Sequence, residues 1–207
     1  MKRMNVSEDQ EQIAEIIRNG GVVVFPTDTV YGFICSALNE KAIERIFKIK
    51  KRDFKKPIPV FVKDIEMAKE FAVVDKKQEE FLRKVWPGNV TVVLKSKGNL
   101  PEMVLEKDKT IGLRIPDYKP LNNLLNALNI PLGQTSVNLA GEAPLNNASD
   151  IMKEFVDQES QPDLIVDGGE LISAEPSTIV GINDELTIFR QGAVSREELE
   201  DLLNYKL

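Results

Sequence analysis

The sequence of 207 residues contains no histidine and one cysteine, Cys35. Without histidine, the chain has neither a serine–histidine–aspartate triad nor a cysteine–histidine pair, and zinc sites with histidine ligands are excluded. A single cysteine forms no internal disulfide and no cysteine-rich metal site, so the cytoplasm is the expected compartment and no protein-held metal is expected. An enzyme of this composition works with carboxylates, hydroxyls, lysines and arginines, which suits phosphoryl and nucleotidyl transfer.

Long apolar runs and familiar nucleotide motifs are absent as well. No stretch approaches the length that crosses a bilayer, and polar residues 7–10 stand where the apolar part of a signal peptide would begin, so no membrane contact is expected. Neither G-x-x-x-x-G-K-[S/T] nor G-x-G-x-x-G occurs, so a nucleotide would bind without a P-loop or a Rossmann fingerprint. The net charge of −6 argues against a wide nucleic-acid surface but leaves a local basic cleft open.

The pattern of apolar residues predicts one α/β domain over residues 1–207. Strands are expected near residues 22–25, 58–62, 90–94, 111–115, 131–136, 164–166, 178–182 and 186–189, and helices near residues 65–71, 75–85 and 149–156. Further helices are expected after a Ser7–Gln10 capping box, after an Asn39 cap and after a Ser195–Glu198 capping box. The alternation is irregular, which predicts a mixed sheet rather than a strictly doubly wound one.

Residues 26–32, with the sequence P-T-D-T-V-Y-G, organise the interpretation of the whole chain. They follow the β-branched run 22–25, and Pro26 should end that strand because it cannot donate to the sheet. A polar loop at the end of a central strand is where α/β sheets place ligands. An ordinary turn explains the same residues equally well, because threonine and aspartate are common in turns.

Several cationic side chains are concentrated between positions 48 and 56. At the end of a helix such a run is often a solvated cap, whereas a Pro-bounded loop with several cations also suits a polyphosphate. The cations are Lys48, Lys50, Lys51, Arg52, Lys55 and Lys56.

Two arginines follow apolar strands. Arg114 lies inside the strand predicted at 111–115, and Arg190 follows the strand predicted at 186–189. A buried guanidinium needs an anion, which is either an internal carboxylate or a ligand. Ser136 and Asn138 stand two positions apart, so in an extended segment they point the same way, although a local turn would explain them too.

Six motifs in this order resemble the YrdC family, the L-threonylcarbamoyladenylate synthases. They are P-T-D-T-V-Y-G, K-x-R, T-x-x-x-R-x-P, S-x-N-x-x-G, S-T and R-x-G-x-x-S, and they extend over nearly the whole chain. The resemblance implies a YrdC-like fold, a twisted open mixed sheet with helices on both sides. It also implies a nucleotidyltransferase that joins L-threonine, bicarbonate and ATP with Mg²⁺, releasing pyrophosphate. A tRNA-modifying complex would then transfer the threonylcarbamoyl group to the adenosine beside the anticodon.

The resemblance also assigns roles to residues. Threonine would contact Thr29, Tyr31, Arg114 and Ser177. The charge that builds up in the reaction would be stabilised by Lys50 and Arg52, the K-x-R pair. ATP would contact this pair and a further set: Lys56, Thr110, Ser136, Asn138 and Arg190.

The chain departs from the family pattern at five positions. Lys51 and Asp53 replace the glycine and proline of K-G-R-P, and Phe61 replaces a histidine of longer members. Ala140 replaces a hydroxyl residue of S-A-N-x-S-G, and Gln134 stands where a small residue is frequent. Two alternatives remain: a carbamoyl-adenylate enzyme with another acceptor, and an RNA-binding module of the same fold that uses the basic turn. Against the second stand a pI near 5.0 and only three tyrosines and one tryptophan for base stacking.

Overall fold

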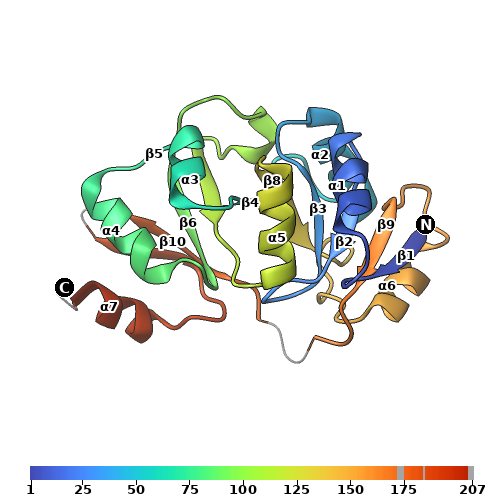
Figure 1. The fold of residues 1–207 in the computed structure, drawn as a ribbon. Helices are drawn as coiled ribbons and strands as arrows, with labels where there is room; N and C mark the ends of the chain where they lie inside the picture. The colour runs from blue at the N-terminus through green and yellow to red at the C-terminus, as the bar shows by residue number, and fades with distance from the viewer. Residues whose placement is uncertain (172–174, 184, 205–207) are drawn as a thin grey trace.

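A long, twisted mixed sheet runs through the computed structural model, which describes residues 1–171, 175–183 and 185–204 (Figure 1). The strand order is β1-β9-β2-β3-β8-β4-β7-β6-β10-β11, and β5 pairs with β6. Strands β2 and β9 are parallel and β3 and β8 antiparallel, so the predicted mixed sheet is confirmed. The bounds are β1 Lys2–Asn5, β2 Val23–Phe25, β3 Gly32–Ser36, β4 Val60–Phe61, β5 Ala72–Val73, β6 Val90–Ser96, β7 Thr110–Arg114, β8 Leu132–Ser136, β9 Leu164–Asp167, β10 Thr178–Ile182 and β11 Leu186–Arg190.

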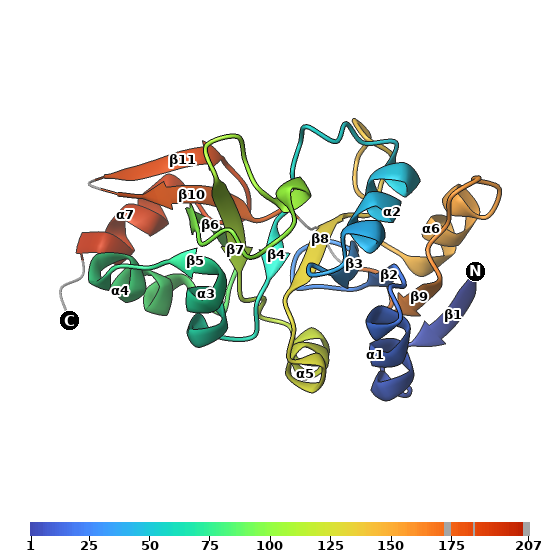
Figure 2. The ribbon, with the colours of Figure 1, turned by 90° about the horizontal axis from the view of Figure 1, so that it is seen from above.

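Helices lie on both sides of this sheet, as predicted (Figure 2). Within the described ranges, none of them is long and apolar enough to cross a bilayer. The bounds are α1 Gln10–Arg18, α2 Glu40–Lys50, α3 Ile65–Phe71, α4 Lys76–Val85, α5 Lys119–Leu128, α6 Ala148–Phe155 and α7 Arg196–Asn204, with a 3₁₀ turn at Glu102–Val104.

The alternation of side chains along the strands divides the core into two layers. In β2, Val23 and Phe25 pack with the apolar stripes of α1 and α5, whereas Val24 belongs to the layer that contains α2 and α6. This second layer continues under α3 and α4 at the other end of the sheet. The fully buried β-branched residues of β2 are typical of a strand covered on both faces.

Helix caps test the local predictions directly. The side chain of Asn39 accepts from Ala42 N at 3.1 Å, and Ser195 and Glu198 form the reciprocal capping box, so both predicted caps are confirmed. The Ser7–Gln10 box was wrong. Asp9 caps α1 instead, because its carboxylate accepts from the first free N–H groups while Ser7 bonds to Asn5 in the preceding turn.

Several strands differ from the predictions, and among them β1 and β5 were not predicted. Strand β3 was not predicted, yet it pairs with β2 in register Phe25↔Gly32, so residues 26–31 form the loop of a hairpin. Strand β4 is shorter than the predicted residues 58–62, because the prolines at 57 and 59 have no N–H for a sheet ladder. The formation of β3 depends on which partner strands are available, and local sequence does not carry that information.

The register places the polar residues of the sheet on one face. Phe61 pairs with both Arg114 and Leu132, so these three side chains share a face, and α5 covers Phe61 and Leu132. On the same face, neighbouring strands carry Thr91 and Gly112. Beyond α5, this face therefore carries small and polar residues together with a few apolar ones, such as Val93 and Ile179.

Candidate functional site

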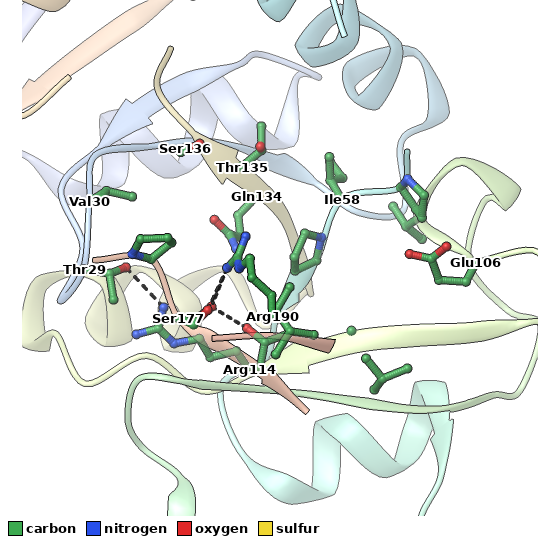
Figure 3. A pocket seen from close by; sticks show the side chains of 18 of the residues that line it. Thr29, Val30, Ile58, Glu106, Arg114, Gln134, Thr135, Ser136, Ser177 and Arg190 are labelled. Carbon is green, nitrogen blue, oxygen red and sulfur yellow. Dashed lines mark hydrogen bonds between the residues drawn. The ribbon is translucent and has the colours of Figure 1, made fainter. Parts of the chain in front are cut away.

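A cavity of about 250 Å³ opens on this polar face of the sheet (Figure 3). Its walls come from the loop after β2, the segment after α2, and strands β6, β7, β8, β10 and β11. Side chains with charged or polar groups dominate the lining: Thr29, Arg52, Thr91, Glu106, Arg114, Gln134, Thr135, Ser136, Ser177 and Arg190.

Arg114 is the most deeply buried of these groups, with 1% of its side chain exposed. Its Nε donates to the carbonyl of Gly88 at 2.7 Å, and its Nη2 donates to Asn89 Oδ1 at 2.5 Å and to Asp28 Oδ2 at 2.7 Å. The Asp28 side chain is 9% exposed, so this is a buried ion pair. Burial lowers the pKa of Arg114, and the charge of Asp28 offsets part of that effect.

The hydroxyl protons of Thr27 and Thr29 determine which hydrogen-bonding groups the Arg114 end of the cavity offers a ligand. Thr27 donates its hydroxyl proton to the carbonyl of Val30 at 2.8 Å, so the 3.0 Å contact between Thr27 Oγ1 and Thr29 Oγ1 requires Thr29 to donate. Thr29 Oγ1 also accepts from Arg114 Nη1 at 3.2 Å. Thr29 therefore presents an acceptor to the cavity, and Arg114 presents one remaining N–H.

Ser177, just before β10, and Arg190, at the end of β11, close the same side. Ser177 Oγ lies 2.8 Å from Thr91 Oγ1, and Arg190 Nη2 donates to the carbonyl of Ser177 at 2.7 Å (Figure 3). Arg190 Nη2 also lies 3.5 Å from Ser177 Oγ, whereas its Nε and Nη1 have no recorded partner among the described residues. Burial, followed by the nearby positive charge of Arg52, lowers the pKa of Arg190.

Arg52 and Glu106 stand toward the other end. Arg52 donates to the carbonyls of Lys56 at 2.9 Å and Pro57 at 3.1 Å, which fixes its guanidinium against the turn after α2. Burial lowers the pKa of Arg52, while the carboxylates of Glu106 and Asp53 act in the opposite direction. Two guanidinium groups that line one cavity, with the charge of Arg52 lowering the pKa of Arg190, indicate an anion site.

Lys50 lies beneath the Ser136 wall rather than in the cavity. Its ammonium donates to the carbonyl of Ser136 at 2.5 Å, to the carbonyl of Asn138 at 3.1 Å and to Asn138 Oδ1 at 2.6 Å. Ser136 Oγ also donates to Asn138 Oδ1, at 2.7 Å, so the loop is held from two sides. Burial, followed by the charge of Arg52, lowers the pKa of Lys50 to about 7.

The structure thus brings together part of the predicted site. The predicted residues that line the cavity are Thr29, Arg52, Arg114, Ser136, Ser177 and Arg190. The other predicted residues lie outside its walls: Tyr31, Lys50, Lys56, Thr110 and Asn138.

Tyr31 and Thr110 are engaged elsewhere. The Tyr31 ring is fully buried, and its hydroxyl donates to the carbonyl of Gly169 at 2.7 Å and accepts from Gly168 N at 2.9 Å. Thr110 donates its hydroxyl proton to Asp108 at 2.7 Å. Their predicted ligand contacts stay predictions.

Other residues of the site did not emerge from the sequence. Thr91 interrupts the apolar run of β6, the same signal that marked Arg114, and would have been found by applying that rule evenly. Asn89 and Glu106 lie in connections without a pattern, and only the folded chain brings them to the site.

Comparisons with known proteins find similarity over most of the chain. A family model named for Sua5, YciO and YrdC, and described as telomere recombination, matches residues 15–192. A putative threonylcarbamoyl-AMP synthase of Methanocaldococcus jannaschii is 34% identical over 197 residues, which are 93% of this chain and 91% of the relative. The uncharacterized protein YciO of Escherichia coli is 33% identical over 183 residues, 87% of each chain.

A solved structure extends the likeness. The crystal structure of P. abyssi Sua5 complexed with L-threonine superposes with a TM-score of 0.88 and 26% identity. The match covers 98% of this chain but 60% of the Sua5 chain, so this chain spans well under two thirds of that protein's length.

Proposed function

The chain belongs to the Sua5, YciO and YrdC family, and on that premise we propose that it is a nucleotidyltransferase that makes L-threonylcarbamoyl-AMP. Its substrates would be L-threonine, bicarbonate and ATP, and pyrophosphate would leave. The observation that carries the proposal is the division of one cavity into two ends. One end holds Thr29, Arg114 and Ser177 in a buried polar cluster, and Arg52 stands toward the other end. Arg190 is bonded to Ser177 and lies within electrostatic range of both Arg52 and Arg114, and neither Arg52 nor Arg190 has a recorded carboxylate bond within the described chain.

The polar end matches the groups of an amino acid. Thr29 Oγ1 accepts from the ammonium or the β-hydroxyl of threonine, because its own proton is engaged by Thr27. The remaining N–H of Arg114 would donate to the carboxylate, and so would the hydroxyl of Ser177 when Thr91 is the donor in the contact between these two hydroxyls. Because Asp28 and Asn89 hold Arg114 in place before the substrate arrives, little reorganisation accompanies binding.

The two cationic side chains, Arg52 and Arg190, match a triphosphate. Arg52 and Arg190 face the same cavity from different elements, and binding a polyphosphate between them would relieve their mutual repulsion. Their donors would stabilise the charge that moves onto the leaving pyrophosphate. Lys50 adds its charge from beneath the Ser136 loop.

Mg²⁺ would accompany ATP. This ion binds through one or two carboxylates together with substrate phosphates, and Glu106 supplies a carboxylate in the lining beside Arg52. Among the residues that the structure describes, no group of three acidic, cysteine or histidine side chains forms a ready-made metal cage. The ion would neutralise phosphate charge, with the nucleotide as its principal ligand.

The product would pass to a tRNA-modifying complex, which transfers the threonylcarbamoyl group to the adenosine beside the anticodon. The free, fully buried Cys35 agrees with the cytoplasm as the compartment of this chemistry.

Release of pyrophosphate from ATP tests the proposal, with L-threonine and bicarbonate each supplied or omitted. A requirement for all three substrates supports it. If ATP is turned over at the same rate without threonine, the cavity binds another acceptor of the carbamoyl group. This alternative is the most relevant one for a chain that also resembles YciO.

One observation favours direct RNA contact as a second activity. Phe54 is 52% exposed in the basic turn and stacks on Phe47 at 5.1 Å between ring centroids, which leaves its outer face open beside Lys51 and Lys55. Stacking on such a ring is a common mode of single-stranded RNA recognition. Binding of unmodified tRNA that is lost in Phe54→Ala, with pyrophosphate release unchanged, would establish it; tRNA binding unaffected by that change would count against it.

A further inference from the structure

The hydroxyl groups along the β8 wall of the cavity present hydrogen-bond acceptors rather than donors. Ser136 donates its hydroxyl proton to Asn138, and Thr29, at the adjoining corner, donates its proton to Thr27. Both hydroxyls therefore present acceptors to whatever enters. An anionic group placed against this wall needs a donor from another side chain.

Gln134 supplies that donor. It lies two residues before Ser136 on β8, and the register puts it on the same sheet face as Arg114. Figure 3 shows its side chain pointing into the cavity, with Thr29 to one side and Arg190 near it. Its Oε1 lies near Gly32, 3.7 Å from the point where a Cβ of that residue would stand.

The carboxamide of Gln134 is open to a ligand. No hydrogen bond by its side chain is recorded within the described residues, where the buried polar atoms lacking a partner are Asp28 Oδ1 and Asn122 Oδ1. An amide that is neither paired nor sealed in the core faces the cavity with two N–H donors. These donors are neutral, so they would attract a small anion without competing with Arg52 and Arg190 for the triphosphate.

The proposed reaction creates such an anion between the two ends of the cavity. The amine of threonine attacks the carbon of bicarbonate, a C–N bond forms, and water leaves together with the proton of the ammonium, which gives a carbamate. A carbamate oxygen then bonds to the α-phosphorus as the bond to pyrophosphate breaks. The carboxyl group must be held beside the amine while it is still negatively charged.

We propose that Gln134 forms the bicarbonate and carbamate subsite of this enzyme, with Nε2 donating to the carboxyl oxygen. The inference rests on the proposed function, and it deepens that function by assigning a residue to the smallest substrate. A carboxylic anion is the class of ligand that this position would take, because the N–H groups of Gln134 donate, and the hydroxyl of bicarbonate can itself donate to Ser136 or Thr29, which accept.

Bicarbonate dependence of pyrophosphate release tests the subsite, at saturating ATP and threonine. Gln134→Leu keeps the volume and removes the donors, and we expect its half-saturating bicarbonate concentration to rise about tenfold or more. Gln134→Glu should raise it further, because a carboxylate repels the carbamate. Val93→Ala, which alters the lining without touching a polar group, should leave bicarbonate dependence at the wild-type value.

Threonine binding, measured by calorimetry without bicarbonate, separates the outcomes. Unchanged threonine affinity in Gln134→Leu, together with weakened use of bicarbonate, supports the subsite. Equal weakening of threonine and bicarbonate use in Gln134→Leu would mean that the side chain only shapes the pocket, and it would overturn the subsite. The subsite would also be overturned if Gln134→Leu had the bicarbonate dependence of the wild type while the wild-type enzyme requires all three substrates. Absence of turnover in the wild-type protein would instead reject the proposed function, and the subsite with it.

Discussion

Arg114→Ala removes one partner of a buried ion pair and leaves the other behind. The side chains of Arg114 and Asp28 are 1% and 9% exposed, so the Asp28 carboxylate would remain in the interior with the N–H of Asp117 as its recorded partner in the described chain. Gly88 and Asn89 would lose their donor as well. Breaking a buried pair in this way costs about 3–5 kcal/mol of unfolding free energy.

For a chain of this length, about 1 kcal/mol corresponds to a shift in Tm of about 2–4 °C, so we expect Tm to fall by about 6–20 °C. Urea unfolding followed by tryptophan fluorescence suits the measurement. The chain has one tryptophan, and Trp86 is buried just before the Gly88–Asn89 turn that Arg114 holds. The m-value should remain that of the wild type, because the surface exposed on unfolding hardly changes.

The double variant Asp28→Ala/Arg114→Ala is the decisive control. It removes both charges, so it should cost about 1–3 kcal/mol less than the sum of the two single variants. Strictly additive losses, or a loss below about 1 kcal/mol in Arg114→Ala, would refute the buried pair as a source of stability. The same result matters for function, because reduced threonine use in Arg114→Ala indicates carboxylate binding only if the variant is folded at the assay temperature.

Three further perturbations follow from local geometry. Because the pKa of Lys50 is lowered to about 7, the unfolded chain binds more protons than the folded chain above that pH. The unfolding free energy of the wild type should therefore rise between about pH 7 and 9, and this rise should be smaller in Lys50→Met. Urea melts at a series of pH values that show no difference between the two proteins would contradict the lowered pKa. Lys51 caps the C-terminus of α2 in the left-handed region, with φ 52°, so Lys51→Gly should raise the unfolding free energy by about 0.5–1 kcal/mol. Asn129 has φ 51°, and Asn129→Gly should raise the unfolding free energy less, because asparagine tolerates the left-handed region. Equal increases in the two variants would argue against strain at Lys51. In Gly192→Ala the new Cβ would collide with the Pro176 carbonyl and displace Ser177, so we expect the unfolding free energy to fall by about 1–3 kcal/mol and threonine binding to weaken. In Gly32→Ala the nearest neighbour of the new Cβ is 3.6 Å away, so the stability should be nearly unchanged. If Gly32→Ala were the less stable variant in thermal melts, the 176–177 segment would have to move freely.

Local signals in the sequence predicted much of the fold. The predicted helix at residues 65–71 and strand at 178–182 coincide with α3 and β10, and the caps at Asn39 and Ser195 are confirmed, because each depends on neighbours within a few residues. Strand β3 was missed because a short apolar segment becomes a strand only where partner strands accept it, here β2 and β8.

The sequence by itself determined which residue types stand at the ends of the strands: a hydroxyl-rich loop, a basic turn and two isolated arginines. Tertiary structure decided what each of them meets. Asp28 and Arg114 are 86 positions apart, and Lys50 and Asn138 are 88 apart, so no periodicity connects them. The fold directed Arg114 mostly toward protein partners, placed Lys50 beneath the Ser136 loop and left Arg52, Arg190 and Gln134 facing the cavity. A charge finds its partner through the packing of the whole sheet, which depends on long-range contacts that a local pattern does not record.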